Sequence, residues 1–116
     1  MTTMTSIPYD NFEDLQLVQY EPGQFYNRHH DISKVHYEYP YGPRILTFFL
    51  YLNDVESGGG TKFDHLGFTV EPKKGMALVW PSLTDDLEEM DYWTWHEALP
   101  VLKVSALHND VHCVIA

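Results

Sequence analysis

The sequence predicts an all-β domain, a sandwich or a barrel with few or no helices. Proline and glycine interrupt the chain at short intervals, and the runs between them are rich in Val, Phe, Tyr, Leu and Thr. Short runs of this composition between turn residues are typical of β-strands. The 116 residues make one small domain, and 44% hydrophobic and 15% aromatic residues are typical of a folded protein. We find no pattern of an amphipathic helix, and we consider a single helical turn only for the acidic loop at 82–91.

The predicted strands are short and separated by turns. In chain order they are 15–20, 25–31, 44–53, 61–63, 66–72, 75–80, 92–98 and 101–107. A glycine-rich turn at 54–60 follows the third strand, and an acidic loop at 82–91 precedes the seventh. The third strand is apolar almost throughout, so we expect it to be buried on both faces. The run at 75–80 predicts a second buried strand.

Acidic residues outnumber basic residues by 17 to 7, and the formal net charge is −10. Binding to the phosphates of a nucleic acid needs a basic patch, so we expect no nucleic-acid partner. The loop at 82–91 carries five carboxylates in ten residues. This loop is either an ordinary solvated loop or an attraction for a cationic substrate.

Cys113 is the only cysteine, so the chain has no intrachain disulfide. The first ten residues have neither the basic nor the apolar region of a signal peptide. No apolar run reaches the length of a transmembrane helix. We therefore expect a soluble chain without a membrane partner. The cytoplasm is the favoured compartment, or the endoplasmic reticulum if a further N-terminal segment precedes this one.

Two histidines and an aspartate are candidate metal ligands. His29 and Asp31 are two residues apart on the predicted strand 25–31, so their side chains point to one face, while His30 points away. His96 lies on a later predicted strand and is the candidate third ligand. Two histidines and one carboxylate form the facial triad of non-haem Fe(II) enzymes, which leaves other coordination positions open. Taken alone, the His-x-Asp pair is also common beside ordinary turns.

Four segments in order resemble the catalytic core of prolyl 4-hydroxylase-like dioxygenases that depend on 2-oxoglutarate and Fe(II). They are 20-YEPGQFYNRHHD-31, 46-LTFFLYLNDVESGGGTKF-63, 72-PKKGMALVWPS-82 and 96-HEALPV-101. The resemblance implies a double-stranded β-helix, or jelly-roll, core. It also implies a division of the chain into a short N-terminal extension at 1–14, a dioxygenase domain at 15–107 and a divergent tail at 108–116.

The resemblance assigns roles to five of these residues. It implies that His29, Asp31 and His96 bind Fe(II), that Tyr51 helps to hold 2-oxoglutarate, and that Tyr26 lines the pocket. It also implies L-ascorbate as the reductant of the iron. The strand pattern alone places Tyr51 on the inner face, where a core aromatic with a satisfied hydroxyl is the alternative. Trp80 is expected in the core rather than in the site.

The sequence departs from the family where a cation should bind the far carboxylate of 2-oxoglutarate. Family members have a Lys or Arg nine or ten positions after the second histidine ligand, but 104–108 contains no base. We take Lys103, the nearby cation, as the candidate anchor. The alternatives are a substitute such as Arg44, or a tail that has lost 2-oxoglutarate binding. The short segment 1–14 also leaves one sheet face uncovered, which favours an oligomer or a partial core.

The favoured function is hydroxylation of a peptidyl residue, with proline as the first candidate and a proline-rich peptide or protein as the substrate. The tyrosine-rich segment 37–41 is either a stacking surface for such a peptide or a plain aromatic turn. A first alternative is a catalytically impaired jelly-roll remnant that binds metal or a partner without turnover. A second is a cupin-type domain that holds zinc or iron without 2-oxoglutarate.

Overall fold

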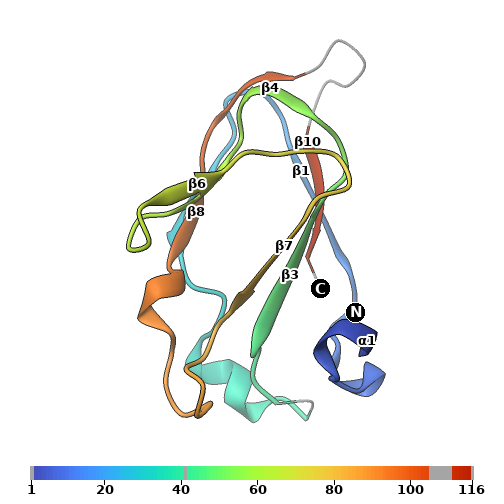
Figure 1. Ribbon diagram of the computed structural model, residues 1–116, viewed down its shortest axis with the longest axis vertical. Helices are drawn as coiled ribbons and strands as arrows, with labels where there is room; N and C mark the ends of the chain where they lie inside the picture. Colours follow the sequence, from blue (N-terminus) through green and yellow to red (C-terminus); the bar gives the residue numbers. More distant parts are fainter. Residues whose placement is uncertain (1, 41, 105–110, 116) are drawn as a thin grey trace.

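The computed structural model describes the backbone of residues 2–40, 42–104 and 111–115 (Figure 1). Its strands are β1 (Gln16–Tyr20), β2 (Tyr26–His29), β3 (Leu46–Tyr51), β4 (Val55–Gly58), β5 (Thr61–Phe63), β6 (Phe68–Val70), β7 (Ala77–Pro81), β8 (His96–Ala98), β9 (Val101–Val104) and β10 (Val111–Ile115). The helical turns are α1 (Thr2–Thr5), η1 (Tyr9–Asn11), η2 (Lys34–Glu38) and η3 (Tyr92–Thr94). The prediction of an all-β chain with few helices is confirmed. Within the described residues, no helix has the length and apolar character needed to cross a membrane.

The strands form two four-stranded sheets and a two-stranded ribbon. The strand order is β1-β10-β3-β7 in the first sheet and β2-β8-β5-β6 in the second, and β4 pairs with β9. Figure 1 shows the first two sheets on opposite sides of the molecule, joined at one end by the ribbon. All pairs are antiparallel. The two sheets therefore face each other across an interior that residues from both can line.

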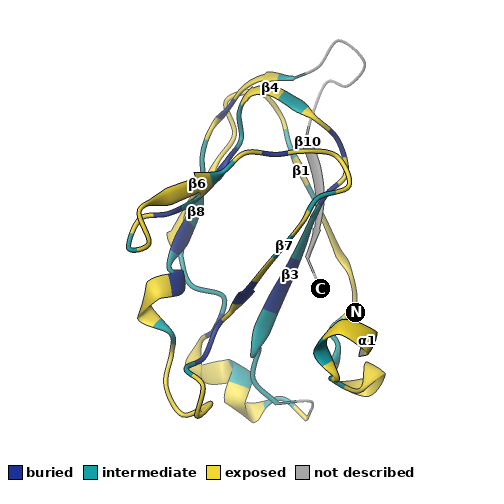
Figure 2. Cartoon of the chain, viewed as in Figure 1, coloured by how far each residue is buried: buried dark blue, intermediate teal, exposed yellow. Residues whose placement is uncertain are grey.

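The two strands expected to be buried differ in their exposure (Figure 2). Every residue of β3 is at least half-buried, because β3 lies between β10 and β7. In β7, Ala77, Val79 and Pro81 are exposed, and Trp80 alone is fully buried. The expectation of a buried strand at 75–80 is wrong for one face, because alternate residues of β7 point to a side of the sheet that meets solvent.

Two predicted strands are shorter than expected around the candidate ligands. The strand predicted at 25–31 ends at His29, so Asp31 lies in the loop after β2. The strand predicted at 92–98 begins only at His96, because residues 92–94 form the turn η3. Asp91 caps this turn by accepting a hydrogen bond of 3.0 Å from the backbone N–H of Trp93. Capping by a short acidic side chain favours a helical turn over a strand at this place.

The end of the chain contributes to the first sheet. The sequence placed a divergent tail at 108–116, but Val111–Ile115 forms β10 between β1 and β3. Cys113 is the register partner of Val18 on one side and of Tyr51 on the other. Pairing on both edges makes this strand an internal part of the sheet, and the predicted division of the chain at residue 107 stays a prediction.

The buried apolar core is small. Among the described residues its members are Ile32, Phe48, Tyr51, Phe63, Trp80, Leu83 and Val101. The rings of Phe63 and Trp80 meet edge to face with centroids 5.4 Å apart. Both rings also contact the imidazole of His96, at 5.5 and 4.8 Å between centroids. The core therefore continues directly into the candidate site.

The backbones of β4 and β9 come close together at Gly58. It has φ +77°, and a Cβ there would meet the carbonyl oxygen of Pro100 and lie 2.8 Å from the amide nitrogen of Leu102. Gly67 has a similar φ of +74° but open space around it. The two glycines thus separate the effect of backbone conformation from the effect of a clash.

We expect Gly58→Ala to destabilise the fold far more than Gly67→Ala. Both variants place a Cβ in the left-handed region, at about 1–2 kcal/mol, but only Gly58→Ala adds overpacking of about 1–3 kcal/mol. Urea denaturation followed by circular dichroism measures both free energies of unfolding. Equal losses in the two variants would contradict the close approach of β4 to β9.

Candidate metal centre

The two histidines meet because their strands pair. His29 ends β2 and His96 begins β8, and the two are register partners in the second sheet. Their rings meet edge to face with centroids 4.3 Å apart. Side chains directly opposite one another on antiparallel strands point to the same side of the sheet. The pairing therefore delivers both imidazoles to one place in the interior.

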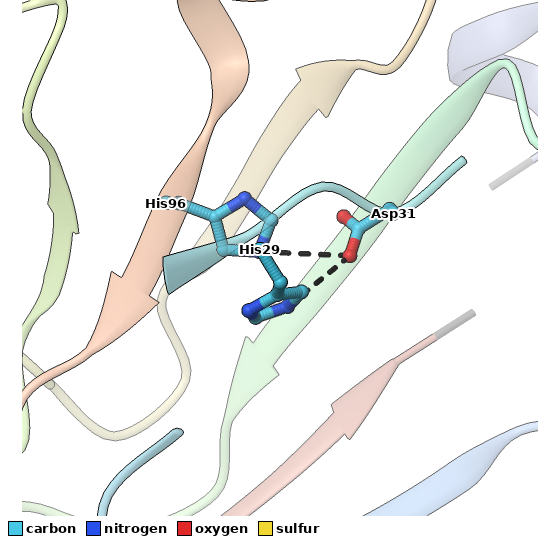
Figure 3. A group of neighbouring side chains, drawn as sticks. All are labelled: His29, Asp31 and His96. Atoms are coloured by element: carbon cyan, nitrogen blue, oxygen red, sulfur yellow. Dashed lines mark ion pairs between the residues drawn. The ribbon is translucent and has the colours of Figure 1, made fainter. Parts of the chain in front are cut away.

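Asp31 completes the group from the loop after β2 (Figure 3). Its Oδ1 lies 3.5 Å from Nε2 of His29 and 3.5 Å from Nε2 of His96. One ligand atom from each of the three residues falls within 4.8 Å of the others. Adjacent ligands of an octahedral ion, bound at about 2.1 Å, are about 3 Å apart. The three side chains need only a small contraction to bind one ion.

The backbone holds both imidazoles in the tautomer that a metal requires. Nδ1 of His29 lies 2.8 Å from the carbonyl oxygen of Asn27, and Nδ1 of His96 lies 2.9 Å from that of Thr94. A carbonyl oxygen only accepts, so each Nδ1 carries the proton and donates it. Each Nε2, on the side of its ring that faces Asp31, is then the atom that can bind an ion. This arrangement is the usual support of a metal-bound histidine.

The charge states also suit a metal ion. Burial raises the pKa of Asp31, but the hydrogen bond from His29, the charge of His96 and the hydroxyl of Thr47 outweigh it and lower the pKa to about 2. Burial lowers the pKa of His96, and the neighbouring Asp31 carboxylate opposes this only in part. At neutral pH the carboxylate is therefore ionised and His96 is neutral, which are the ligand forms.

The second oxygen of Asp31 is held from the opposite sheet. Its Oδ2 accepts a hydrogen bond of 2.6 Å from the hydroxyl of Thr47 and one of 2.9 Å from the indole N–H of Trp80. Thr47 and Trp80 are themselves register partners on β3 and β7. Sequence reasoning missed both residues and placed Trp80 in the core. Their role follows from their cross-strand pairing, which cannot be read from the sequence.

His29, Asp31 and His96 line the wall of a cavity of about 740 Å³ between the two sheets. Its walls include residues of the N-terminal segment, of both four-stranded sheets and of the loop before β3, among them Ile7, Pro8, Phe12, Val18, Tyr20, Tyr26, Arg44, Phe49, Thr61 and Ala98. A cavity of this size is in the range of small-molecule sites. The site can therefore hold an ion and an organic molecule together.

The tyrosines expected near the site lie at different depths. Tyr26 lines the cavity, and its ring lies 4.1 Å from that of His29, between centroids. Tyr51 is buried beneath the wall, where its hydroxyl lies 2.6 Å from the hydroxyl of Thr61. Thr61 itself lines the cavity. Tyr26 is thus placed as a pocket residue, and contact of Tyr51 with 2-oxoglutarate stays a prediction.

Lys103 does not lie at the site. It is on β9, opposite Ser57, with a side chain that is 70% exposed and an ion pair of 2.6 Å to Glu56. The prediction of Lys103 as the carboxylate anchor is therefore wrong, because β9 pairs with β4 in the ribbon outside the cavity. Most of the window 104–108, where the family carries its cation, lies outside the described residues.

Arg44, the other cation considered, does line the cavity. Glu13 from the N-terminal segment holds its guanidinium through hydrogen bonds of 2.5 Å from Nε and 2.7 Å from Nη2. Nη1 lies 3.5 Å from the carbonyl oxygen of Asp31. Among the described residues, Arg44 is the one lysine or arginine in the cavity wall.

The chain belongs to the 2OG-Fe(II) oxygenase superfamily, whose family model matches residues 15–109. It is 41% identical over 102 residues to a protein of Acanthamoeba polyphaga mimivirus named "Putative prolyl 4-hydroxylase", covering 83% of this chain and 42% of that protein. It is 38% identical over 104 residues to human prolyl 4-hydroxylase subunit alpha-1, covering 85% of this chain and 19% of that protein. The chain thus spans less than half the length of these relatives.

The fold is also that of a solved relative. The crystal structure of the viral collagen prolyl hydroxylase of Paramecium bursaria Chlorella virus-1, in its 2OG complex, matches with a TM-score of 0.73 and 28% identity. The match covers 89% of this chain and 56% of that one. Oxygenases of this superfamily have a jelly-roll core, so the predicted double-stranded β-helix and the resemblance to prolyl 4-hydroxylases are confirmed.

We expect His29→Ala to weaken binding of Co²⁺, an air-stable substitute for Fe(II), by more than about 100-fold, the most that loss of an outer-shell partner costs. The neighbouring His30 is the matched control, because it is not one of the three ligand residues and its Nε2 lies 2.9 Å from the carbonyl oxygen of Asp91. His30→Ala should bind Co²⁺ within about tenfold of the wild type. Visible-absorption titration measures both affinities, and equal losses would contradict the ligand assignment.

Acid should weaken metal binding in one pH range. Because the folded pKa of His96 lies below its ordinary 6.5, affinity for Co²⁺ should be constant above that pH and fall as the pH drops further. The carboxylate of Asp31 stays ionised down to about pH 2 and adds nothing to this change. Titrations between pH 5 and 8, a range of about three units around the histidine pKa, test the expectation. A loss of affinity that already sets in above pH 6.5 would contradict it.

Proposed function

We propose that this chain forms the catalytic core of an Fe(II)- and 2-oxoglutarate-dependent dioxygenase that hydroxylates a peptidyl residue, with proline as the first candidate. The observation that carries the proposal is the convergence of His29, Asp31 and His96 on a common centre at the wall of a 740 Å³ cavity. When bound, Fe(II) supplies the activation of oxygen that is coupled to decarboxylation of 2-oxoglutarate.

The residues of this chain have distinct tasks in that reaction. The two Nε2 atoms and Oδ1 of Asp31 would hold the ion at the wall of the cavity. The ring of Tyr26 packs on His29 and restricts its rotation. The buried rings of Phe63 and Trp80 keep water from the far side of His96.

The substrate class is proposed from the relatives. Both the mimivirus and the human proteins are named as prolyl 4-hydroxylases, and the viral structure is titled a collagen prolyl hydroxylase in a 2OG complex. These names support a peptide substrate, which we propose to be proline-rich. L-Ascorbate is proposed as the reductant on the same family grounds.

The impaired remnant is the less favoured reading. The three residues still converge at the cavity wall, both imidazoles are oriented by backbone carbonyl oxygens, and the pKa of Asp31 is low, so the features that metal binding needs are retained. Arg44 at the cavity wall also offers a cation for a carboxylate, provided that Glu13 releases it. We therefore favour the active enzyme.

The test is an anaerobic titration with Fe(II) and then 2-oxoglutarate, which should produce a visible metal-to-ligand charge-transfer band. His96→Ala should lose the band. Lys103→Ala should keep it with unchanged affinity, because Lys103 pairs with Glu56 at the surface. Loss of the band in Lys103→Ala would restore that lysine as the anchor.

Turnover is tested separately by admitting oxygen and a proline-rich peptide and measuring succinate and hydroxyproline. Formation of both products supports the proposal, and succinate without hydroxyproline points to another substrate. Iron binding without the charge-transfer band would favour the remnant or the cupin-type domain over the dioxygenase.

A further inference from the structure

We propose that Thr47 and Trp80 act as a pair of positioning residues that select which oxygen of Asp31 binds the metal ion. This inference rests on the metal centre of the proposed function. It goes further, because it assigns a role in metal binding to two residues of the opposite sheet that touch no metal themselves.

The pair comes from a single register match. Thr47 on β3 lies directly opposite Trp80 on β7, and both side chains are buried, with 3% and 5% of their surface exposed. Both donate to the same atom, Oδ2 of Asp31, at 2.6 and 2.9 Å. Two donors on one carboxylate oxygen occupy its lone pairs. Oδ1 is left as the oxygen that faces the two imidazoles, 3.5 Å from each Nε2.

Asp31 needs this support because no strand holds it. His29 and His96 are fixed by the pairing of β2 with β8, but the chain has left β2 before Asp31. A carboxylate in a loop can rotate and present either oxygen, or both. The hydrogen bonds from β3 and β7 remove that freedom before the ion arrives, so binding does not have to order the side chain.

The consequence is a one-oxygen ligand. Binding through both oxygens would require Oδ2 to give up two buried donors, and a buried donor without a partner is unfavourable. With Asp31 restricted to Oδ1, three protein atoms would hold the ion, and Asp31 would not take up a second coordination position. Thr47 and Trp80 therefore affect both the affinity for the metal ion and the number of coordination positions that Asp31 takes.

Packing is the competing explanation, since the ring of Trp80 also contacts Phe63 and His96, with centroids 5.4 and 4.8 Å apart. The variants must therefore remove hydrogen bonds and keep shape. Thr47→Val removes the hydroxyl at nearly constant volume. Thr47→Ser keeps a hydroxyl that can donate to Asp31. Trp80→Phe removes the indole N–H and keeps an aromatic ring.

The experiment is a titration of the full chain with Co²⁺, recording both affinity and the visible spectrum at saturation. Thr47→Val and Trp80→Phe should each bind Co²⁺ about 10–100-fold more weakly, and Thr47→Ser within about threefold of the wild type. The double variant Thr47→Val with Trp80→Phe should also show a changed spectrum at saturation, because Asp31 is then free to bind through both oxygens. A purely structural role would leave the spectrum of the saturated site unchanged.

The outcomes separate this inference from the proposed function. Wild-type affinity and spectrum in a folded Thr47→Val or Trp80→Phe variant would overturn the inference and leave the metal centre standing. Failure of the wild type to bind Co²⁺ would overturn both. Circular dichroism confirms the fold of each variant, and if one of the two single variants does not fold, the other decides.

Discussion

The antiparallel pairing of β2 with β8 is the interaction on which the site depends. It sets His29 opposite His96 and turns two residues far apart in the chain into one pair of ligands. The same pairing places the carbonyl oxygens of Asn27 and Thr94 where they accept the Nδ1 protons of these histidines. Strand register thus decides both the position and the tautomer of the imidazoles, and a shift by one residue would turn both away.

The opposite sheet supplies what this pairing cannot. A buried carboxylate is unfavourable unless it is hydrogen-bonded or paired, and Asp31 lies in a loop that provides neither. Thr47 and Trp80 on β3 and β7 complete its environment across the interior. The cavity lies between the same two sheets. Ligand support and the substrate space are therefore consequences of a single arrangement, two sheets that face each other.

The sequence was sufficient to predict the three ligand residues but not the residues that surround them. His29, Asp31 and His96 were found by residue type and motif order, although Asp31 lies beyond the strand that was meant to orient it. Lys103 was wrong because distance along the chain from His96 does not say which strand a residue pairs with, and β9 turns into the ribbon with β4. Exposure of Val79 was missed because an apolar run does not reveal which face of its strand stays uncovered.

The sequence by itself determined the all-β class, the ligand types and the family, because turn residues, apolar runs and local motifs are properties of short segments. Only the tertiary structure decided that the C-terminal strand β10 lies between β1 and β3, that Glu13 holds Arg44, and that one oxygen of Asp31 faces the histidines. Each of these depends on contacts between segments far apart in the chain. Such contacts form through strand pairing and packing across the interior, and no local pattern encodes which partners meet.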